Sequence, residues 1–242
     1  MPLPKITAPT YQLKLPSTGQ TIKYRPFLVK EEKVLILALE SQNVQQITIA
    51  IKQVLSECII TKGVKVEDLP SFDIEYVFLN VRAKSVGEAI DLIVTCQDDG
   101  ETEVSVKIFV DQVNVEFAED HSPEIKLDDS VSLKMKYPSL DQFIQNNFDF
   151  QDQESMSTIE KSFEIIADCI DTVFTAEEAW SSSDCTKKEL LEFIEGMNSS
   201  QFKMVEKFFE TMPKLTHTFT VKNPKTKKEN DVTLEGLSSF FG

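Results

Sequence analysis

The residues suited to chemistry are few: four cysteines, two histidines and several pairs of adjacent carboxylates. Cys96 lies at the turn of "IDLIVTCQDDGETEVSVKIFV", which reads as strand, tight acidic turn, strand. Residues 219–234, "FTVKNPKTKKENDVTL", repeat that outline with a polar turn. Two such hairpins, far apart in sequence, are how a zinc ribbon presents its two Cys-x-x-Cys knuckles. The first question is therefore whether these hairpins hold a metal.

The candidate ligands do not make a structural zinc site. Cys96 is the one cysteine at a ligand position, and His217 lies far along the chain. Zn²⁺ in structural sites takes four convergent thiolate or imidazole ligands, so we expect no metal and no cofactor. Strand pairing and apolar packing should then hold the hairpins together. The residues expected to face each other are Ile90, Leu92 and Val94 in the first hairpin and Phe219 and Val221 in the second.

A search for catalytic groups finds no specific motif. HExxH, GxSxG, GxxxxGK[ST] and GxGxxG are all missing from the sequence, and seven glycines leave little material for a phosphate-binding loop. His121 in "FAEDHSPE" could belong to a weak metal site with carboxylates, although an exposed acidic loop explains it more simply. The lone Trp180 fits either a core position or an interface anchor, and we favour the core. We expect no catalytic residues and no enzymatic activity.

Composition restricts the possible partners. The chain has 242 residues, a net charge of −15 and 41% hydrophobic residues, which is typical of a folded protein. Nucleic acid and anionic membrane surfaces need a basic face, so neither is an expected partner. The basic cluster at 222–228 is best explained as a solvated turn. The start of the sequence does not resemble a signal peptide, and irregularly spaced cysteines indicate reduced thiols in a cytosolic setting.

Hydrophobic periodicity predicts an α+β fold. Residues 10–28 read as a β-hairpin, and helices are expected at about 30–41, 43–59 and 72–84. Residues 88–137 are rich in short β-runs, and 139–212 read as helical, with Ile170 and Val173 ending an apolar helical stripe. The predicted division is an N-terminal α+β region (1–138), a helical subdomain (139–212), and a second hairpin with a C-terminal segment (213–242) that packs back on the first region.

Several phrases of the sequence resemble a known family. They are "LKLPSTGQTIKYRPFLVKEEKVLILALES", "FDIEYVFLNVRAKSVGE" and "VTLEGLSSFFG". They are similar to the baseplate hub assembly proteins of contractile-tailed bacteriophages of the T-even type. The resemblance covers about residues 4–95 and 205–242. Residues 110–200 share the general character of the family but none of these specific phrases. These phrases are not generic, so the match is fairly specific.

The resemblance implies a zinc site that this sequence does not keep. Many members of the family carry a Cys-x-x-Cys pair in each hairpin, which gives a four-cysteine zinc site. Here Cys96 remains, the second position is Asp99 or a neighbour, and Val221, Asn223 and Pro224 occupy the other knuckle. We therefore expect a zinc-ribbon-like pair of hairpins, 88–137 with 215–235, without its metal.

The resemblance also implies a function in tail assembly. The expected role is a chaperone-like factor that binds a hub subunit, and the alternative is a permanent structural subunit of the baseplate hub. The expected partners are hub or central spike proteins of the same phage, and a homo-oligomer is another option. The protein would lie in the host cytoplasm during assembly, with the virion as an alternative location.

The two terminal segments are the expected partner-binding elements. Both are more apolar than a frayed end requires, and the first could add a strand to a sheet edge. The alternative is that both segments dock on the protein's own core. The proposed contact residues are Tyr11, Leu13 and Leu15 near the N-terminus and Leu237, Phe240 and Phe241 near the C-terminus.

Overall fold

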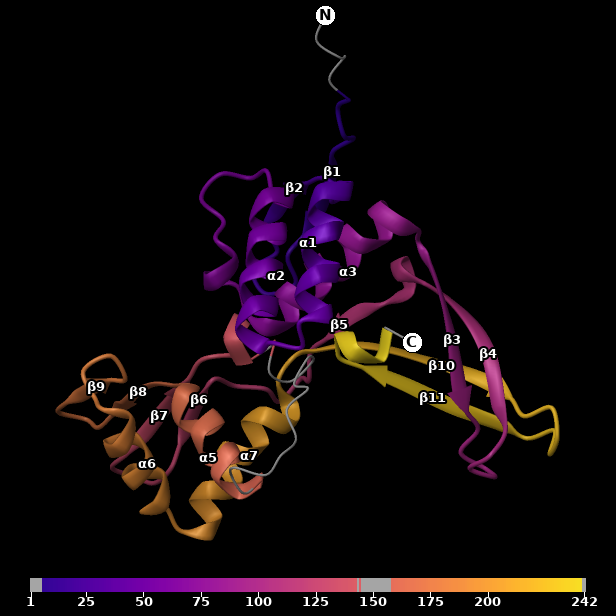
Figure 1. The fold of residues 1–242 in the computed structure, drawn as a ribbon. Helices are drawn as coiled ribbons and strands as arrows, with labels where there is room; N and C mark the ends of the chain where they lie inside the picture. The colour runs from indigo at the N-terminus through magenta and orange to yellow at the C-terminus, as the bar shows by residue number, and fades with distance from the viewer. Residues whose placement is uncertain (1–5, 143, 145–157, 241–242) are drawn as a thin grey trace, which may run out of the picture.

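The structure is a computed structural model that describes residues 6–142, 144 and 158–240. It confirms the α+β class, with helices and several small antiparallel sheets (Figure 1). The first region contains β1 (Tyr11–Lys14), β2 (Thr21–Tyr24), α1 (Val29–Glu40), α2 (Val44–Cys58), the 3₁₀ turn η1 (Val66–Asp68) and α3 (Ser71–Val86). The hairpin and the three helices lie close to where hydrophobic periodicity predicts them.

Local signals explain where these helices begin and end. The Asn43 side chain accepts a hydrogen bond from the Gln46 N–H at 3.0 Å and caps α2. Pro70 directly precedes α3. Gly87, which has a φ of 134°, directly follows the last residue of the helix. Such a φ is in the region that glycine adopts without a steric penalty, so Gly87 provides the stop.

A buried ion pair fixes the start of α1. The Glu31 side chain is 5% exposed and accepts hydrogen bonds from the Arg25 guanidinium at 3.0 and 3.2 Å and from the Leu28 N–H at 2.6 Å. Burial alone would raise the pKa of Glu31, but these hydrogen bonds lower it to about 2. The carboxylate thus stays charged, and α1 is held in a defined orientation at its N-terminus.

Two β-hairpins form a second part of the fold. They contain β3 (Ala89–Thr95) with β4 (Glu103–Phe109), and β10 (Lys214–Lys222) with β11 (Glu229–Glu235). The 3₁₀ turn η2 (Val110–Gln112) leads to β5 (Asn114–Glu116), which pairs with β10 in a sheet of order β11-β10-β5. In Figure 1 the two hairpins extend away from the helices from different starting points and converge toward their tips, where they share an apolar cluster.

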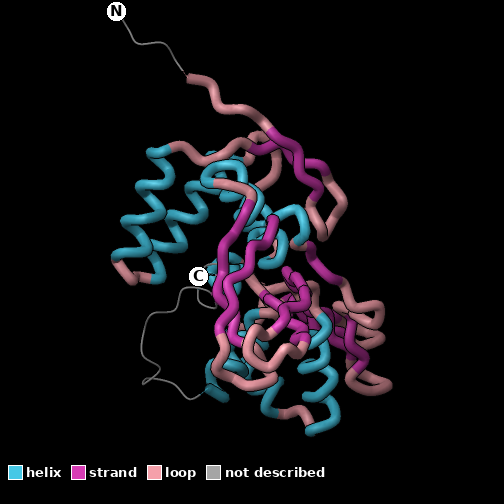
Figure 2. The backbone as a smooth tube through the Cα atoms, turned by 90° about the vertical axis from the view of Figure 1, so that its right-hand side faces the viewer, coloured by secondary structure: helices cyan, strands magenta, loops and turns pink. Residues whose placement is uncertain are grey.

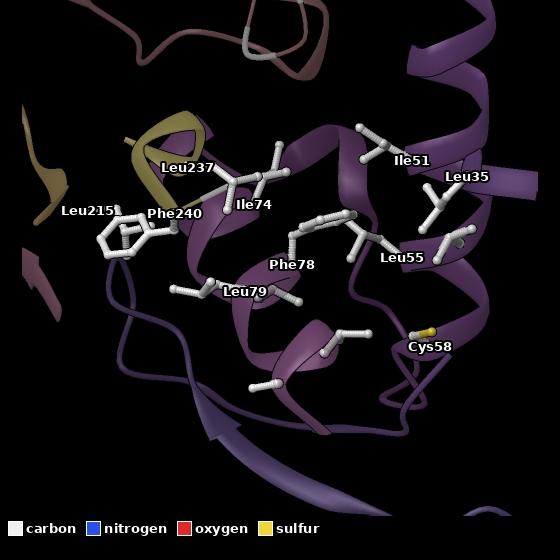
Figure 3. Packing of buried hydrophobic residues seen from close by; sticks show 14 of the residues in the cluster. Leu35, Ile51, Leu55, Cys58, Ile74, Phe78, Leu79, Leu215, Leu237 and Phe240 are labelled. Carbon is white, nitrogen blue, oxygen red and sulfur yellow. The ribbon is translucent and has the colours of Figure 1, made fainter. Parts of the chain in front are cut away.

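The C-terminal segment returns to the first region. The 3₁₀ turn η3 (Leu237–Phe240) follows β11 and packs against α3. Figure 3 shows Leu215, Leu237 and Phe240 beside Ile74 and Leu79 of α3, and all five belong to the same buried core cluster. The first core therefore joins both ends of the described chain.

The remaining elements form a second core. They are β6 (Glu124–Lys126), β7 (Ser132–Met135), α5 (Thr158–Asp168), β8 (Ile170–Phe174), β9 (Ala179–Ser181), α6 (Lys187–Glu195) and α7 (Ser199–Thr211). The four strands form a sheet of order β6-β7-β8-β9. Capping boxes start α6 at Thr186 and α7 at Asn198.

The prediction that 139–212 is helical is wrong at residues 170–174 and 179–181, which are the strands β8 and β9. Helix α5 ends at Asp168, and residues 170–174 are the strand β8, in which Val173 pairs with Leu133 of β7. The run Ile-Asp-Thr-Val-Phe is rich in β-branched residues, which favour strands when a partner strand is present. Its apolar spacing continued that of α5, so periodicity alone could not separate the strand from the helix.

The predicted domain boundaries at 138 and 212 stay a prediction. The second core nevertheless draws residues from both sides of residue 138. Ile125, Leu127 and Leu133 are buried in the same cluster as Ile194 and Phe208. Strands β6 and β7 therefore pack with the helical region rather than with the first hairpin.

Candidate functional site at the hairpin tips

The turn of the first hairpin has a defined backbone geometry. The Cys96 N–H donates to the Thr102 carbonyl at 2.8 Å, and the Gly100 N–H donates to the Cys96 carbonyl at 2.9 Å. Gly100 has a φ of 68°, in the left-handed region that glycine adopts readily. Cys96, Asp99 and Gly100 thus hold the first, fourth and fifth positions of a knuckle-like turn.

The turn of the second hairpin has a similar geometry and is one residue shorter. The Asn223 N–H donates to the Lys228 carbonyl at 2.9 Å, and the Lys227 N–H donates to the Asn223 carbonyl at 2.9 Å. Lys227 has a φ of 67° and takes the place of Gly100. Asn223 therefore corresponds to Cys96, and Thr226 corresponds to Asp99.

Hydrogen bonds join the two turns where a ribbon would place its metal. The Asn223 Nδ2 donates to Asp98 Oδ1 at 2.8 Å and to Asp99 Oδ2 at 3.0 Å. The Thr226 hydroxyl donates to the Asp98 carboxylate, and the Asp98 N–H donates to Asn230 Oδ1 at 2.8 Å. We call Asp98, Asp99, Asn223, Thr226 and Asn230 the tip network. Asn223 is fully buried and Asn230 is 6% exposed.

Two side chains of this network, Asn223 and Asp99, also stabilise their own turns. Asn223 Oδ1 accepts from the Lys225 N–H at 2.8 Å and the Thr226 N–H at 3.1 Å. Asp99 accepts from the Thr102 hydroxyl at 2.6 Å and from the Thr102 N–H at 3.0 Å. Buried polar groups need such partners, because an unpaired one costs about 1–3 kcal/mol. The polar side chains of Asn223 and Asp99 therefore have hydrogen-bond partners without an added ligand.

The network keeps its carboxylates charged. Hydrogen bonds from Thr226 and then Asn223 lower the pKa of Asp98 below its usual value. The Thr102 hydroxyl and N–H lower the pKa of Asp99 well below its usual range. Hydrogen bonds to a carboxylate favour its ionised form, which explains both directions. At neutral pH both side chains are acceptors.

Cys96 behaves as a core residue. It is fully buried in a small cluster with Val94, Val221 and Val232, and burial raises the pKa of its thiol, as do Asp98 and Asp99. A neutral thiol is a poor metal ligand. Within residues 6–142, 144 and 158–240, no group of three or more His, Cys, Asp and Glu side chains could hold a metal ion. The residues at the four knuckle positions do not fit zinc.

The expected apolar packing of the hairpins is confirmed in part. Val94 and Val221 are buried together, and Phe219 packs against the same cluster. Ile90 and Leu92 instead belong to the first core, on which Phe219 also packs. Apolar contacts therefore join the hairpins near their tips, and the tip network joins the turns themselves.

The residues proposed for partner binding lie mostly inside the protein. Leu15 is 2% exposed, and Leu237 and Phe240 are fully buried, so they would have to leave the core to touch a partner. Tyr11 and Leu13 are half-buried against the same core. Phe241 lies outside the described residues. Burial favours the alternative that both segments dock on the protein's own core, and partner binding by these residues stays a prediction.

Two exposed apolar surfaces escaped the sequence analysis. Trp180, on strand β9, is 43% exposed at the edge of the second sheet, so the core position that we favoured does not describe it. A shallow apolar depression beside it is lined by Val131, Val173, Thr175, Trp180, Cys185, Glu189, Leu190 and Phe193. The second surface lies on α1, where Val29, Ile36 and Leu37 are 80%, 49% and 54% exposed. Apolar residues of a predicted helix are normally assigned to its buried face, so the sequence did not reveal that these side chains are exposed.

The fold and its closed hairpin tips define an α+β protein with a ribbon-like hairpin pair that is held by hydrogen bonds. A family model described as T4 bacteriophage base plate protein matches residues 8–242. The chain therefore belongs to this family, and its role is connected with the baseplate of a phage tail. Searches of curated proteins and of solved structures found no significant match. No helix in the described part of the chain is long and apolar enough to cross a membrane.

Proposed function

We propose that this protein is an assembly factor for the baseplate hub, which holds a hub subunit during tail assembly and has no enzymatic activity. The family match over residues 8–242 carries the connection to the baseplate. The finer role rests on charge and on exposed apolar surface, as follows.

The negative charge of the protein is concentrated in one part of the chain. Residues 1–88 contain 11 Lys and Arg and nine Asp and Glu, whereas residues 89–242 contain 14 and 31. The second part thus carries a net charge of −17 and the first a net charge of +2. Such an acidic surface speeds the capture of a basic partner and makes the complex sensitive to salt. A factor that must later be displaced benefits from both properties.

The Trp180 surface supplies a matching apolar anchor. Trp180 lies at a sheet edge beside an apolar depression, and the turn before it carries the exposed residues Glu177 and Glu178. Exposed tryptophans next to an apolar pocket often dominate binding energy at interfaces. We assign this surface to a hub subunit that presents an apolar group next to basic side chains.

A capture experiment tests the binding proposal. Tagged protein is recovered from infected cells at low salt, and bound proteins are identified by mass. We expect a hub subunit in the eluate, and we expect Trp180→Ser to reduce its recovery at least about tenfold. Phe109→Ser is the matched control, because Phe109 is also an exposed aromatic residue on a strand. Equal recovery with Trp180→Ser and wild type would rule out this surface.

A second experiment separates an assembly factor from a permanent subunit. An assembly factor should be abundant in the lysate and depleted in purified, salt-washed particles. A permanent subunit of the hub should instead remain at a fixed copy number per particle, because larger apolar interfaces survive high salt. Quantitative mass spectrometry of the particles makes this measurement. A fixed stoichiometric copy number would contradict the assembly-factor proposal and favour the structural alternative.

A further inference from the structure

Helix α1 carries apolar residues on more than one side. Residues 34–39, "VLILAL", are all apolar, yet Leu35 and Ala38 are the buried ones among them. The helix packs mainly on α2, and Figures 1 and 2 show this helix pair at the outside of the molecule. A helical segment that is apolar on every side is normally covered on all sides. The apolar outer side of α1 is therefore not covered by any other element of the described chain.

The outer side of α1 has a regular pattern. Residues 29, 33, 36 and 40 follow the spacing of one helical face, and Leu37 lies beside them. All five side chains are exposed. We call Val29, Lys33, Ile36, Leu37 and Glu40 the α1 face. Within the described chain, the side chains of Lys33 and Glu40 make no hydrogen bond or ion pair.

This pattern is complementary to itself. In an antiparallel pair of α1 helices with a two-fold axis between Ile36 and Leu37, Ile36 meets the partner's Leu37. The same axis places Lys33 opposite the partner's Glu40, and the symmetry makes each contact twice. A two-fold interface requires such self-complementarity, because the same patch serves on both subunits.

The charge distribution permits a second copy at this face. A net charge of −15 would oppose self-association if it were spread evenly. Residues 1–88, which contain α1, carry a net charge of +2, and the acidic excess lies in residues 89–242. Repulsion between the acidic parts decays over about 8 Å at physiological salt. A contact through α1 therefore avoids most of the repulsion.

We propose that this protein forms a weak, two-fold symmetric homodimer through antiparallel packing of the α1 face. Ile36 and Leu37 form the apolar centre, and two reciprocal ion pairs between Lys33 and Glu40 set the register. The contact is small, so the dimer dissociates readily. This inference is independent of the proposed hub binding, which uses the Trp180 surface.

Charge-reversal variants test the proposal. Association of the full chain is measured by analytical ultracentrifugation at concentrations up to about 1 mM, a range that detects weak association. Wild type is expected to show a reversible monomer–dimer equilibrium. Lys33→Glu and Glu40→Lys should each weaken it at least about tenfold, because each creates two like-charge pairs. An equimolar mixture of the two variants should form a heterodimer, since its opposed charges match again. The double variant K33E/E40K should dimerise like wild type.

Two further variants complete the test. Lys62→Glu makes the same charge change at an exposed position outside α1 and should leave dimerisation unchanged. Ile36→Asp should abolish the dimer without unfolding the monomer, because Ile36 is 49% exposed. A wild type that stays monomeric at every concentration would overturn the proposal. A mixture of Lys33→Glu and Glu40→Lys that stays monomeric would overturn the antiparallel register.

Discussion

The two ends of the C-terminal hairpin are fixed by different physics. At its base, Leu215, Leu237 and Phe240 are fully buried against α3 (Figure 3). At its tip, the polar residues Asn223 and Asn230 are buried and reach across to the first hairpin. The base is an apolar contact, and the tip is a network of hydrogen bonds.

The two kinds of contact contribute differently to the fold. Burying an apolar side chain contributes about 1.5–3 kcal/mol and has no direction. A hydrogen bond contributes about 0.5–1.5 kcal/mol net but requires a defined geometry. The base should therefore stabilise the fold, whereas the tip should set how the two hairpins align. Four predictions test this comparison, in order of decreasing expected effect.

Truncation at the base should have the largest effect. Phe240→Ala removes a fully buried ring from the first core and should cost about 3–5 kcal/mol in the free energy of unfolding, measured by chemical denaturation. Phe109→Ala is the matched control at a 47% exposed position and should cost less than about 1 kcal/mol. Equal losses in the two variants would show that the base does not stabilise the fold.

Truncation at the tip should have a smaller effect. Asn223→Ala removes a fully buried side chain that donates to Asp98 and Asp99 and accepts from the Lys225 N–H, which should cost about 1–3 kcal/mol. Asn114→Ala is the matched control, because its side chain is exposed and makes one long hydrogen bond of 3.3 Å. If the two variants lose the same stability, the tip network contributes nothing specific.

Acid should loosen the tip before the base. The folded-state pKa values of Asp98 and Asp99 are lowered, so their stabilisation is complete above the unfolded pKa of about 3.9. It is lost as pH falls below that value toward the folded pKa values. Hydrogen exchange of the Asp98 and Thr226 amides should therefore accelerate on acidification, relative to the Gly236 amide at the base. Parallel acceleration at both ends would contradict the comparison.

Chelation should have no effect. Structural zinc contributes about 10 kcal/mol or more to folding, so its removal would be obvious. We expect well under one zinc per chain after purification without chelator, and the same melting temperature with excess EDTA. The triple variant D99C/N223C/T226C is the positive control, because with Cys96 it places four thiols at the four knuckle positions. Its melting temperature should fall with EDTA, whereas stoichiometric zinc in the wild type would refute the prediction.

Much of the local structure follows from short-range patterns in the sequence. Turn residues and alternating apolar residues located the three β-hairpins that begin at β1, β3 and β10, and hydrophobic periodicity located the three helices of the first region. These signals act between residues close in sequence, so a single sequence displays them. The shortage of cysteines at the knuckles was likewise readable without a structure.

Contacts between residues far apart in the chain became visible only in the folded molecule. Asn223 lies 125 positions from Asp98 in the sequence, and no local sequence pattern predicts the hydrogen bond between them. Residues 170–174 became a strand because β7 supplied a partner, and the partly exposed apolar residues of α1 had the same sequence signature as core residues. Periodicity reports which face of an element is apolar, but burial depends on what the rest of the chain places against that face.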